Sequence, residues 1–491
     1  MAAVKKGLAV VEQSSLKPVF EQGTGLVVRG NKLSQLKDMA RKRRNICLTV
    51  FAKFLTPLRE RRLRVVTTKS ISMNKLVVSV GIIALGSSVL HAVETGALNA
   101  QQSKKAWSVS ASLRGFYDDN FNAQSGANKQ SSTGVEISPS IDFGVAGEQS
   151  SFDVGYDLTA RYYEKAVSGS SDHSAFTHNF NATATHALSE RVRLNAGESF
   201  VVGQEPSLQR GTIDNPQYIS GNNIRNYANV GANIQATSLL GFQVGYNNTL
   251  VDYADRGNFS NSARLDRMEH GVSLGSKWTI SPQTSGLLGV RLGKTEYLRK
   301  GEYADSGVLS TARNNRSLIL YGGAEHEFNN TLSGSLLVGG QRTTYPNNPN
   351  TDSKWSPWVE SSLDYQYQTE TKFSLGFSYS RSPSDLVAPV GPAGLDFVRD
   401  TETAAVYASV KHEIAAHLNA SGSIRYQSAK FNGGSVNGKK DNFLLLGLGL
   451  AYEFNPNLEG NIGYNFDDLS SDSVGRSYNR NKFYVGVTAK Y

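Results

Sequence analysis

Charged side chains recur at every second position of long segments in this chain. Asp153, Asp157 and Arg161, for example, alternate with the apolar residues of the segment 152–162. Charges gathered on one face of an extended segment are suited to lining an aqueous channel, where they set ion selectivity. The predicted lining residues are Glu136, Asp153, Asp157, Arg161, Arg193, Arg291, Glu325, Lys372, Lys411, Arg425 and Glu459. Because both signs are present, we expect weak selectivity. For any single residue, a solvated wall without a ligand is the alternative.

Residues that could carry catalysis or hold a metal ion are sparse. The sequence contains no His-Glu-x-x-His and no phosphate-binding loop. The only cysteine, Cys47, precedes the body of the chain, so neither a disulfide nor a thiolate metal site is expected in the body. The histidines of the body are His173, His178, His186, His270, His326, His412 and His417. Isolated histidines on strands are usually structural, so we expect no enzyme, no metal site and no cofactor.

The composition favours a chain built mostly of strands. Apolar residues make up 39% and charged residues 19%, both low for a globular enzyme of 491 residues, while glycine (47) and aromatic residues (10%) are frequent and proline (13) is scarce. The formal net charge of +9 comes from the front of the chain, because residues 1–72 hold 16 Lys and Arg against 4 Asp and Glu. The rest is close to neutral, so we expect no binding of nucleic acid by the body.

The front of the chain is predicted to contain an export signal. Met73-Asn74-Lys75 is a short basic region, residues 76–90 are apolar, and small residues around Ala92 suit cleavage. We therefore expect a signal peptide over 73–92 and a short periplasmic segment over 93–105. Residues 1–72 are interpreted as a basic leader ahead of a mis-assigned start, and as disordered. Nucleic-acid binding by its basic runs and a buried helix over 76–90 are the alternatives.

From residue 106 to residue 491 the sequence alternates between apolar and polar positions, which is the period of a β-strand. The segments run to 12–17 residues, longer than strands of soluble proteins and long enough to cross a membrane at a tilt. Eighteen strands are predicted, with 16–18 plausible, at 106–118, 132–147, 150–163, 172–188, 191–204, 222–238, 240–255, 265–281, 283–300, 313–328, 331–345, 354–370, 372–382, 401–415, 417–431, 440–454, 457–468 and 478–491.

Connections between these segments alternate in length. Links such as Glu148-Gln149 and Asn455-Pro456 are tight, whereas links such as 205–221 are long and polar. Short turns at one rim and long loops at the other are typical of an antiparallel transmembrane β-barrel with periplasmic turns and extracellular loops. A soluble β-sandwich with its apolar faces turned inward is the alternative.

Aromatic residues near segment ends predict the girdles that such barrels place at the two membrane interfaces. The predicted girdle residues are Tyr162, Tyr163, Tyr253, Tyr297, Tyr345, Trp355, Trp358, Phe431 and Phe454. The last segment also ends on an aromatic residue after strict alternation. A C-terminal assembly signal is therefore predicted at Phe483, Val485, Val487 and Tyr491.

The segment Gly115-Phe116-Tyr117-Asp118-Asp119-Asn120-Phe121-Asn122 resembles the first strand of the putative beta-barrel porin 2 family. The strand sequences at 375–380 and 461–466 are similar to that family as well. The resemblance covers residues 100–491. It implies an outer-membrane barrel with a porin-like role, and it carries over no catalytic residues.

The linker 383–400 contains three of the 13 prolines and several apolar residues, which is unusual for a loop open to water. We interpret it as a segment that folds into the barrel mouth and narrows the pore. Deleting 385–396 should then raise the single-channel conductance. Packing of this loop against its neighbours outside the lumen is the alternative.

Together these patterns predict a bacterial outer-membrane porin through which small hydrophilic solutes diffuse. The first alternative is a structural barrel whose long loops associate with surface polysaccharide, and the second is an outer-membrane enzyme. The expected partners are outer-membrane lipid, lipopolysaccharide and the barrel-assembly machinery, with a homo-oligomer left open.

Overall fold

A computed structural model describes the body of the chain. It covers residues 106–166, 173–203, 223–254, 265–298, 302–303, 308–348, 353–368, 371–384, 398–473 and 475–491. The predicted leader, signal peptide and periplasmic segment, residues 1–105, lie outside the described residues.

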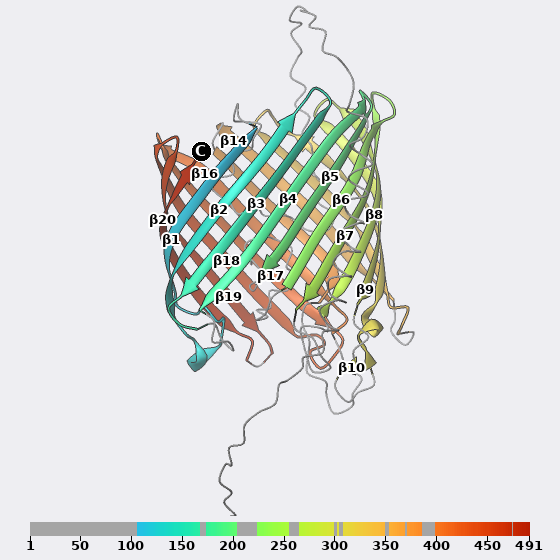
Figure 1. Cartoon of the computed structure of the whole chain (residues 1–491). Helices are drawn as coiled ribbons and strands as arrows, with labels where there is room; N and C mark the ends of the chain where they lie inside the picture. The colour runs from blue at the N-terminus through green and yellow to red at the C-terminus, as the bar shows by residue number, and fades with distance from the viewer. Residues whose placement is uncertain are drawn as a thin grey trace, which may run out of the picture. The chain divides into compact units, whose positions relative to one another are not determined.

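Eighteen long antiparallel strands form one closed sheet, which Figure 1 shows as tilted ribbons around a barrel. The strands are β1 (Trp107–Asp118), β2 (Ser132–Ala146), β3 (Ser150–Tyr163), β4 (Ser174–Ser189), β5 (Val192–Gly203), β6 (Asn223–Gln235), β7 (Leu240–Tyr253), β8 (Arg267–Ser281), β9 (Thr284–Tyr297), β12 (Asn315–Glu327), β13 (Leu332–Thr344), β14 (Lys354–Gln368), β15 (Thr371–Pro383), β16 (Asp400–Ala415), β17 (Leu418–Asn432), β18 (Lys440–Asn455), β19 (Leu458–Ser471) and β20 (Tyr478–Lys490). The predicted number and order of strands are confirmed, and each predicted strand end lies within three residues of the observed one.

Each strand pairs with its neighbours in sequence, and β20 pairs with β1 to close the ring. The closing register runs from Ser110 opposite Lys490 to Asp118 opposite Lys482. Closure leaves no edge of the 18-stranded sheet unpaired, which is the condition for a sheet to cross the hydrocarbon of a membrane.

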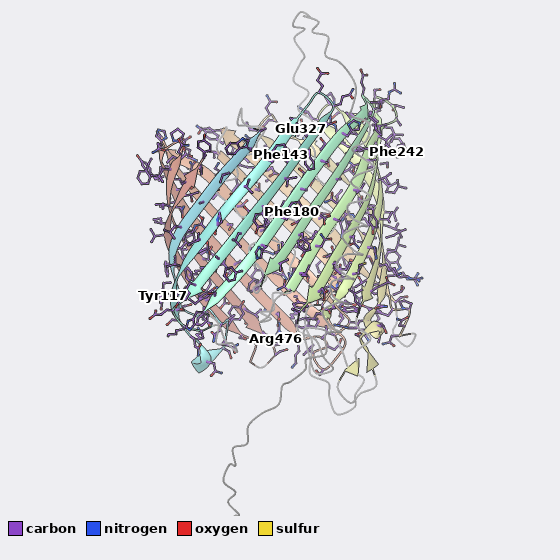
Figure 2. All side chains as sticks on the ribbon, viewed as in Figure 1. Tyr117, Phe143, Phe180, Phe242, Glu327 and Arg476 are labelled. Carbon is purple, nitrogen blue, oxygen red and sulfur yellow. The ribbon has the colours of Figure 1, made fainter. Side chains whose placement is uncertain are left out.

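The two faces of the wall differ in the direction expected for a barrel in lipid. Large apolar side chains point outward and are exposed, including Phe143, Phe180 and Phe242 in Figure 2. The polar side chains between them point inward, so the apolar face does not form a common core. This arrangement excludes the soluble sandwich, in which the apolar faces would be buried together.

The two rims also differ. Links at the rim that holds the C-terminus contain two to four residues, whereas links at the opposite rim contain at least six (Figure 1). We call these the turn rim and the loop rim. The loop rim also carries structure that the sequence did not predict: a two-stranded hairpin of β10 (Glu302–Tyr303) and β11 (Val308–Leu309), followed by a 3₁₀ helix, η3 (Ser310–Arg313). Strands of two residues are too short to give a periodic signal.

The aromatic girdle prediction is partly wrong. Tyr162, Trp355 and Phe454 are exposed on the outer face as expected. The other six rings are buried: Tyr163, Tyr253, Tyr297, Tyr345, Trp358 and Phe431. Neighbouring residues of a strand point to opposite faces, so Tyr163 cannot share the outer face with Tyr162. Nearness to a strand end therefore does not make a ring part of the girdle unless the ring also lies on the outward face.

Candidate pore lining

The inner wall is built from the alternate positions that leave the apolar residues outside. Arg291, for instance, lies between Val290 and the exposed Leu292 of β9, and therefore points inward. The same alternation places all eleven predicted lining residues on the inward face of their strands. Whether they line a conducting path remains a proposal.

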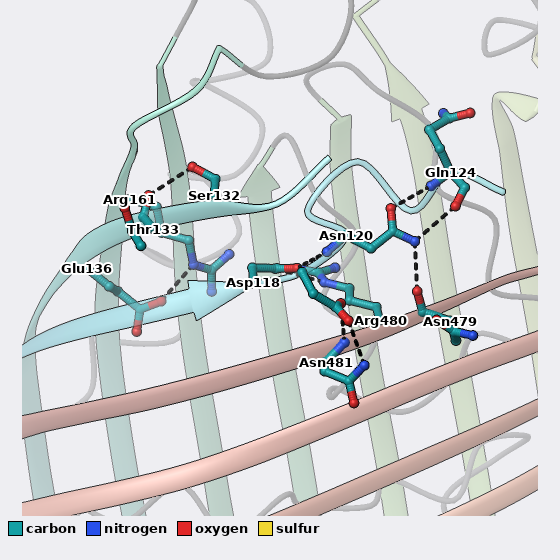
Figure 3. Close-up of polar contacts among 11 residues, drawn as sticks. Asp118, Asn120, Gln124, Ser132, Thr133, Glu136, Arg161, Asn479, Arg480 and Asn481 are labelled. Atoms are coloured by element: carbon teal, nitrogen blue, oxygen red, sulfur yellow. Dashed lines mark hydrogen bonds and ion pairs between the residues drawn. The ribbon is translucent and has the colours of Figure 1, made fainter. Parts of the chain in front are cut away.

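Glu136 is the centre of a cluster of charges on β1, β2 and β3. Its carboxylate accepts a hydrogen bond from Nε of Arg161 at 2.6 Å, and the other oxygen lies 3.4 Å from Nη1 of Arg114 (Figure 3 shows the Arg161 contact). Arg114 also lies over the ring of Tyr484, 5.1 Å from its centroid. The cluster holds one buried carboxylate between two guanidinium groups, so its charges largely compensate one another.

Arg291 occupies a second cluster, on β9, β12 and β14. Its guanidinium lies 3.3 Å from Oε2 of Glu360. Cζ of Arg291 also lies over two aromatic rings, 5.0 Å from the centroid of Tyr321 and 4.7 Å from that of Trp358. Aromatic faces attract a desolvated cation. The arginine is thereby fixed against the wall rather than extended across the lumen.

Three further ion pairs join side chains of different strands on the inner face. Lys277 and Glu325 are 2.6 Å apart, Lys490 and Glu459 are 2.6 Å apart, and Lys372 and Asp364 are 3.1 Å apart. Asp157 accepts a hydrogen bond from Asn179, and Arg425 donates one to Gln427. By contrast, Asp153 and Arg193 have no ion pair within the described part of the chain.

Sequence reasoning missed most of the partners in these pairs: Arg114, Lys277, Glu360, Asp364 and Lys490. Each one lies on the polar face of its strand, so the alternation could have found it. The pairing itself depends on the register between strands, and no single strand reveals it. Lys372 of β15, for example, lies opposite Gln366 of β14, which places it diagonally across from Asp364.

Three inward tyrosines lie flat over glycines of the neighbouring strand. Tyr321 is opposite Gly289, Tyr407 is opposite Gly376, and Tyr484 is opposite Gly463. A Cβ added at Gly376 would lie 2.2 Å from Cζ of Tyr407. The missing side chains leave room for the rings against the wall, which keeps these rings from extending across the lumen.

Side chains at the end of the first strand, β1, are bonded to the start of the last strand, β20, at the loop rim. Asp118 of β1 accepts two hydrogen bonds from Arg480 of β20, at 2.9 and 2.6 Å, and both side chains are buried (Figure 3). The carboxylate of Asp119 binds the backbone and side-chain amides of Asn481, at 2.6 and 2.7 Å. The side chain of Asn120 donates to the carbonyl of Asn479 at 2.7 Å.

Asp118, Asp119 and Asn120 therefore act as one seam latch. Behind it, Phe121 stacks on Tyr163 with ring centroids 5.3 Å apart, and both rings are buried. The first long loop is thus packed at the barrel mouth beside β3. Asp118, which belongs to the segment that resembles the porin family, thus bonds a residue 362 positions away in the sequence and helps to close the barrel.

The histidines form no catalytic arrangement in the described residues, because none of them has a hydrogen bond or ion pair to a carboxylate there. Ser150 contacts Nδ1 of His186 at 2.7 Å, Thr284 contacts that of His326 at 2.9 Å, and Thr371 contacts that of His412 at 3.0 Å. These pairs lie at the turn rim.

One segment of the chain has the spacing of a hydrolase motif. Residues 271–275 fit the spacing Gly-x-Ser-x-Gly of hydrolase nucleophiles. They lie within β8, however, and not at the strand-to-helix turn that exposes such a serine. Across the described residues, no group of three or more histidine, cysteine or acidic side chains could hold a metal ion, and no helix there is long and apolar enough to cross a membrane.

Comparison with known proteins gives one family match. The profile of the family described as putative beta-barrel porin 2 matches residues 108–491. No curated protein matches the chain.

The chain is also similar to several solved structures of bacterial proteins. The outer membrane protein opdK from Pseudomonas aeruginosa is 11% identical with a TM-score of 0.41, over 78% of this chain and 99% of that one. For OccAB2 from Acinetobacter baumannii the values are 13% and 0.39, over 78% and 98%. For a BenF-like porin from Pseudomonas fluorescens Pf-5 they are 11% and 0.39, over 79% and 99%.

Proposed function

Because the chain belongs to the putative beta-barrel porin 2 family, we propose that it is a channel for passive diffusion of small hydrophilic solutes across a bacterial outer membrane. The observation that carries the proposal is the closed 18-stranded barrel with an apolar outer face and a charged inner face. Barrels of 16–18 strands are wide enough to leave an aqueous channel.

The inner wall supports diffusion rather than tight binding. Its best-defined charges are already satisfied by one another, as in the pairs of Arg161 with Glu136 and Lys277 with Glu325. A solute passing such a wall exchanges water for weak polar contacts and finds few uncompensated charges to hold it. Fast passage and low affinity are the properties of a general pore.

The location and the partners are part of the proposal. An apolar outer face on a closed barrel suits the outer membrane, with lipopolysaccharide around the loop rim. The outward side chains Phe483, Val485, Val487 and Tyr491 are exposed on the last strand, where the barrel-assembly machinery could recognise them before closure. An enzymatic role is disfavoured because no described histidine has a hydrogen bond to a carboxylate; their partners are hydroxyls, a backbone carbonyl and an amide.

The linker predicted to narrow the pore lies mostly outside the described residues, which leave out 385–397. What can be seen is its end: Val398 is buried with Phe431 and Val436, and Asp400 is bonded to Arg381 at 2.6 Å. The described end of the linker is therefore anchored to β15 and to the β17–β18 loop.

Conductance across planar lipid bilayers tests the proposed function. Purified protein that shows a folded, heat-modifiable gel band should produce stepwise openings, and vesicles containing it should swell in small sugars. The same preparation after boiling is the control for non-specific leakage. A folded barrel that neither conducts nor permits swelling would contradict the proposal and favour the structural, polysaccharide-associated barrel.

A further inference from the structure

A group of polar side chains on neighbouring strands interrupts the apolar outer face. His178, Glu198, Asn226, Asn248 and His270 lie on five successive strands, β4 to β8, and together form what we call the β4–β8 stripe. The register runs through it: Glu198 and Asn248 are both opposite Ala228, and Asn248 is opposite His270. The stripe is therefore continuous from β5 to β8, while His178 lies four residues along β4 from Ala182, the residue opposite Glu198.

The side chains of the stripe point outward, away from the lumen. Glu198 alternates with Phe200, and its partner Ala228 alternates with Val230; Phe200 and Val230 are both exposed on the outer face. Asn248 and His270 likewise share their face with the exposed Tyr246 and Val272. None of these positions can contribute to the pore lining.

Within the stripe the polar groups are only partly satisfied. Asn226 donates to one carboxylate oxygen of Glu198, and the other oxygen has no hydrogen bond within the described part of the chain. The imidazole of His270 contacts the hydroxyl of Tyr246 at 2.8 Å and the amide of Asn248 at 3.3 Å. His178 contacts the hydroxyl of Tyr156 at 2.9 Å. Capacity for further hydrogen bonds remains on the outer face.

Glu198 is the most unusual member because of its depth. It is the seventh of the twelve residues of β5, and every other outward carboxylate, lysine or arginine of the described strands is among the last four residues at one end of its strand. At comparable levels the opposite wall presents side chains such as Val406, Ile424 and Leu448. Polar and ionisable groups facing lipid are costly, and such groups within a membrane usually have a polar partner.

We propose that the β4–β8 stripe is the surface through which two copies of this chain contact each other in the membrane. Lipid tails offer no hydrogen bonds at the depth of Glu198, and a soluble partner cannot reach it. A second copy inserted in the same orientation presents the same groups at the same depth. The stripe also suits self-association, because it carries acceptors (the carboxylate of Glu198) together with amide and imidazole donors.

The mass of the protein in lipid nanodiscs, measured by native mass spectrometry, tests this contact. The wild-type chain is expected to be an oligomer. The double variant Glu198→Leu/Asn226→Leu should weaken association by about tenfold or more, as expected for loss of a central interface contact. Because leucine suits a lipid-facing position, the variant should keep its heat-modifiable band, so a smaller mass cannot be ascribed to unfolding.

A matched control changes another outward amide. Asn442 of β18 bonds the hydroxyl of Tyr426 on a different part of the wall, and Asn442→Leu should leave the mass unchanged. A wild-type chain that is monomeric in nanodiscs would overturn the proposal, and so would a double variant that keeps the wild-type mass. The test does not depend on conductance, so the stripe and the proposed pore can fail separately.

Discussion

At the scale of single residues, the width of the lumen depends on glycines that have no chemistry of their own. Tyr407 can lie against the wall only because Gly376 opposite it has no side chain. In the variant Gly376→Val the tyrosine ring must swing away from the wall, since the new Cβ would overlap it. We expect a folded barrel with lower single-channel conductance, measured in planar bilayers.

Two variants separate this effect from a general loss of structure. Adding Tyr407→Ala to Gly376→Val removes the displaced ring and should restore the conductance. Gly115→Val lies on the outer face, where an added Cβ meets nothing within 4 Å, and it should leave the conductance unchanged. A Gly376→Val barrel that is folded and conducts like the wild type would show that Tyr407 does not border the conducting path.

At the scale of elements, the strands were predictable and their lateral contacts were not. A period of two sustained over 12–16 residues leaves little freedom in where a strand begins and ends. The same alternation placed Arg161 and Glu136 on one face, but their pairing depends on the register of β2 with β3. Tyr163 shows the converse failure, because its position near a strand end suggested a girdle while its alternating face put it inside.

The seam latch is the clearest contact that no local pattern could reveal, since it joins residues 362 positions apart. Replacing Asp118 with alanine would leave Arg480 buried without its partner at the point where the barrel closes. Loss of one partner of a buried ion pair costs about 3–5 kcal/mol. We expect Asp118→Ala to lower the urea midpoint of unfolding in detergent and the temperature at which the gel band shifts.

A second ion pair at the loop rim, with a buried carboxylate and a partly buried guanidinium, provides the comparison. Asp441 and Arg476 are 2.6 Å apart but join segments only 35 positions apart, and they do not connect β1 to β20. If closure by the seam limits the stability of the barrel, Asp441→Ala should lower the midpoint less than Asp118→Ala does. Equal losses would mean that the two pairs contribute only as ion pairs, and that the seam has no special role.

At the scale of the whole molecule, the charges of the inner wall are arranged in pairs rather than in rings of one sign. Glu136 lies between two arginines, Glu360 is beside Arg291, and Glu459 is beside Lys490. Rings of one sign are what confer strong selectivity on a channel. A wall of compensated pairs should therefore give a reversal potential close to zero under a gradient of potassium chloride.

Removing the charge of one partner in a pair should shift the ion selectivity, and the direction of the shift should depend on which partner is removed. Lys277 and Glu325 are suited to this test because both are partly exposed on the inner face, 2.6 Å apart. Lys277→Gln leaves the carboxylate of Glu325 uncompensated, so the reversal potential should shift toward cation selectivity. Glu325→Gln leaves the ammonium of Lys277 and should shift it toward anions, while the double variant should return close to the wild type. Shifts of the same sign in both single variants, or none in either, would mean that ions do not pass this pair and that compensation between charges does not govern selectivity.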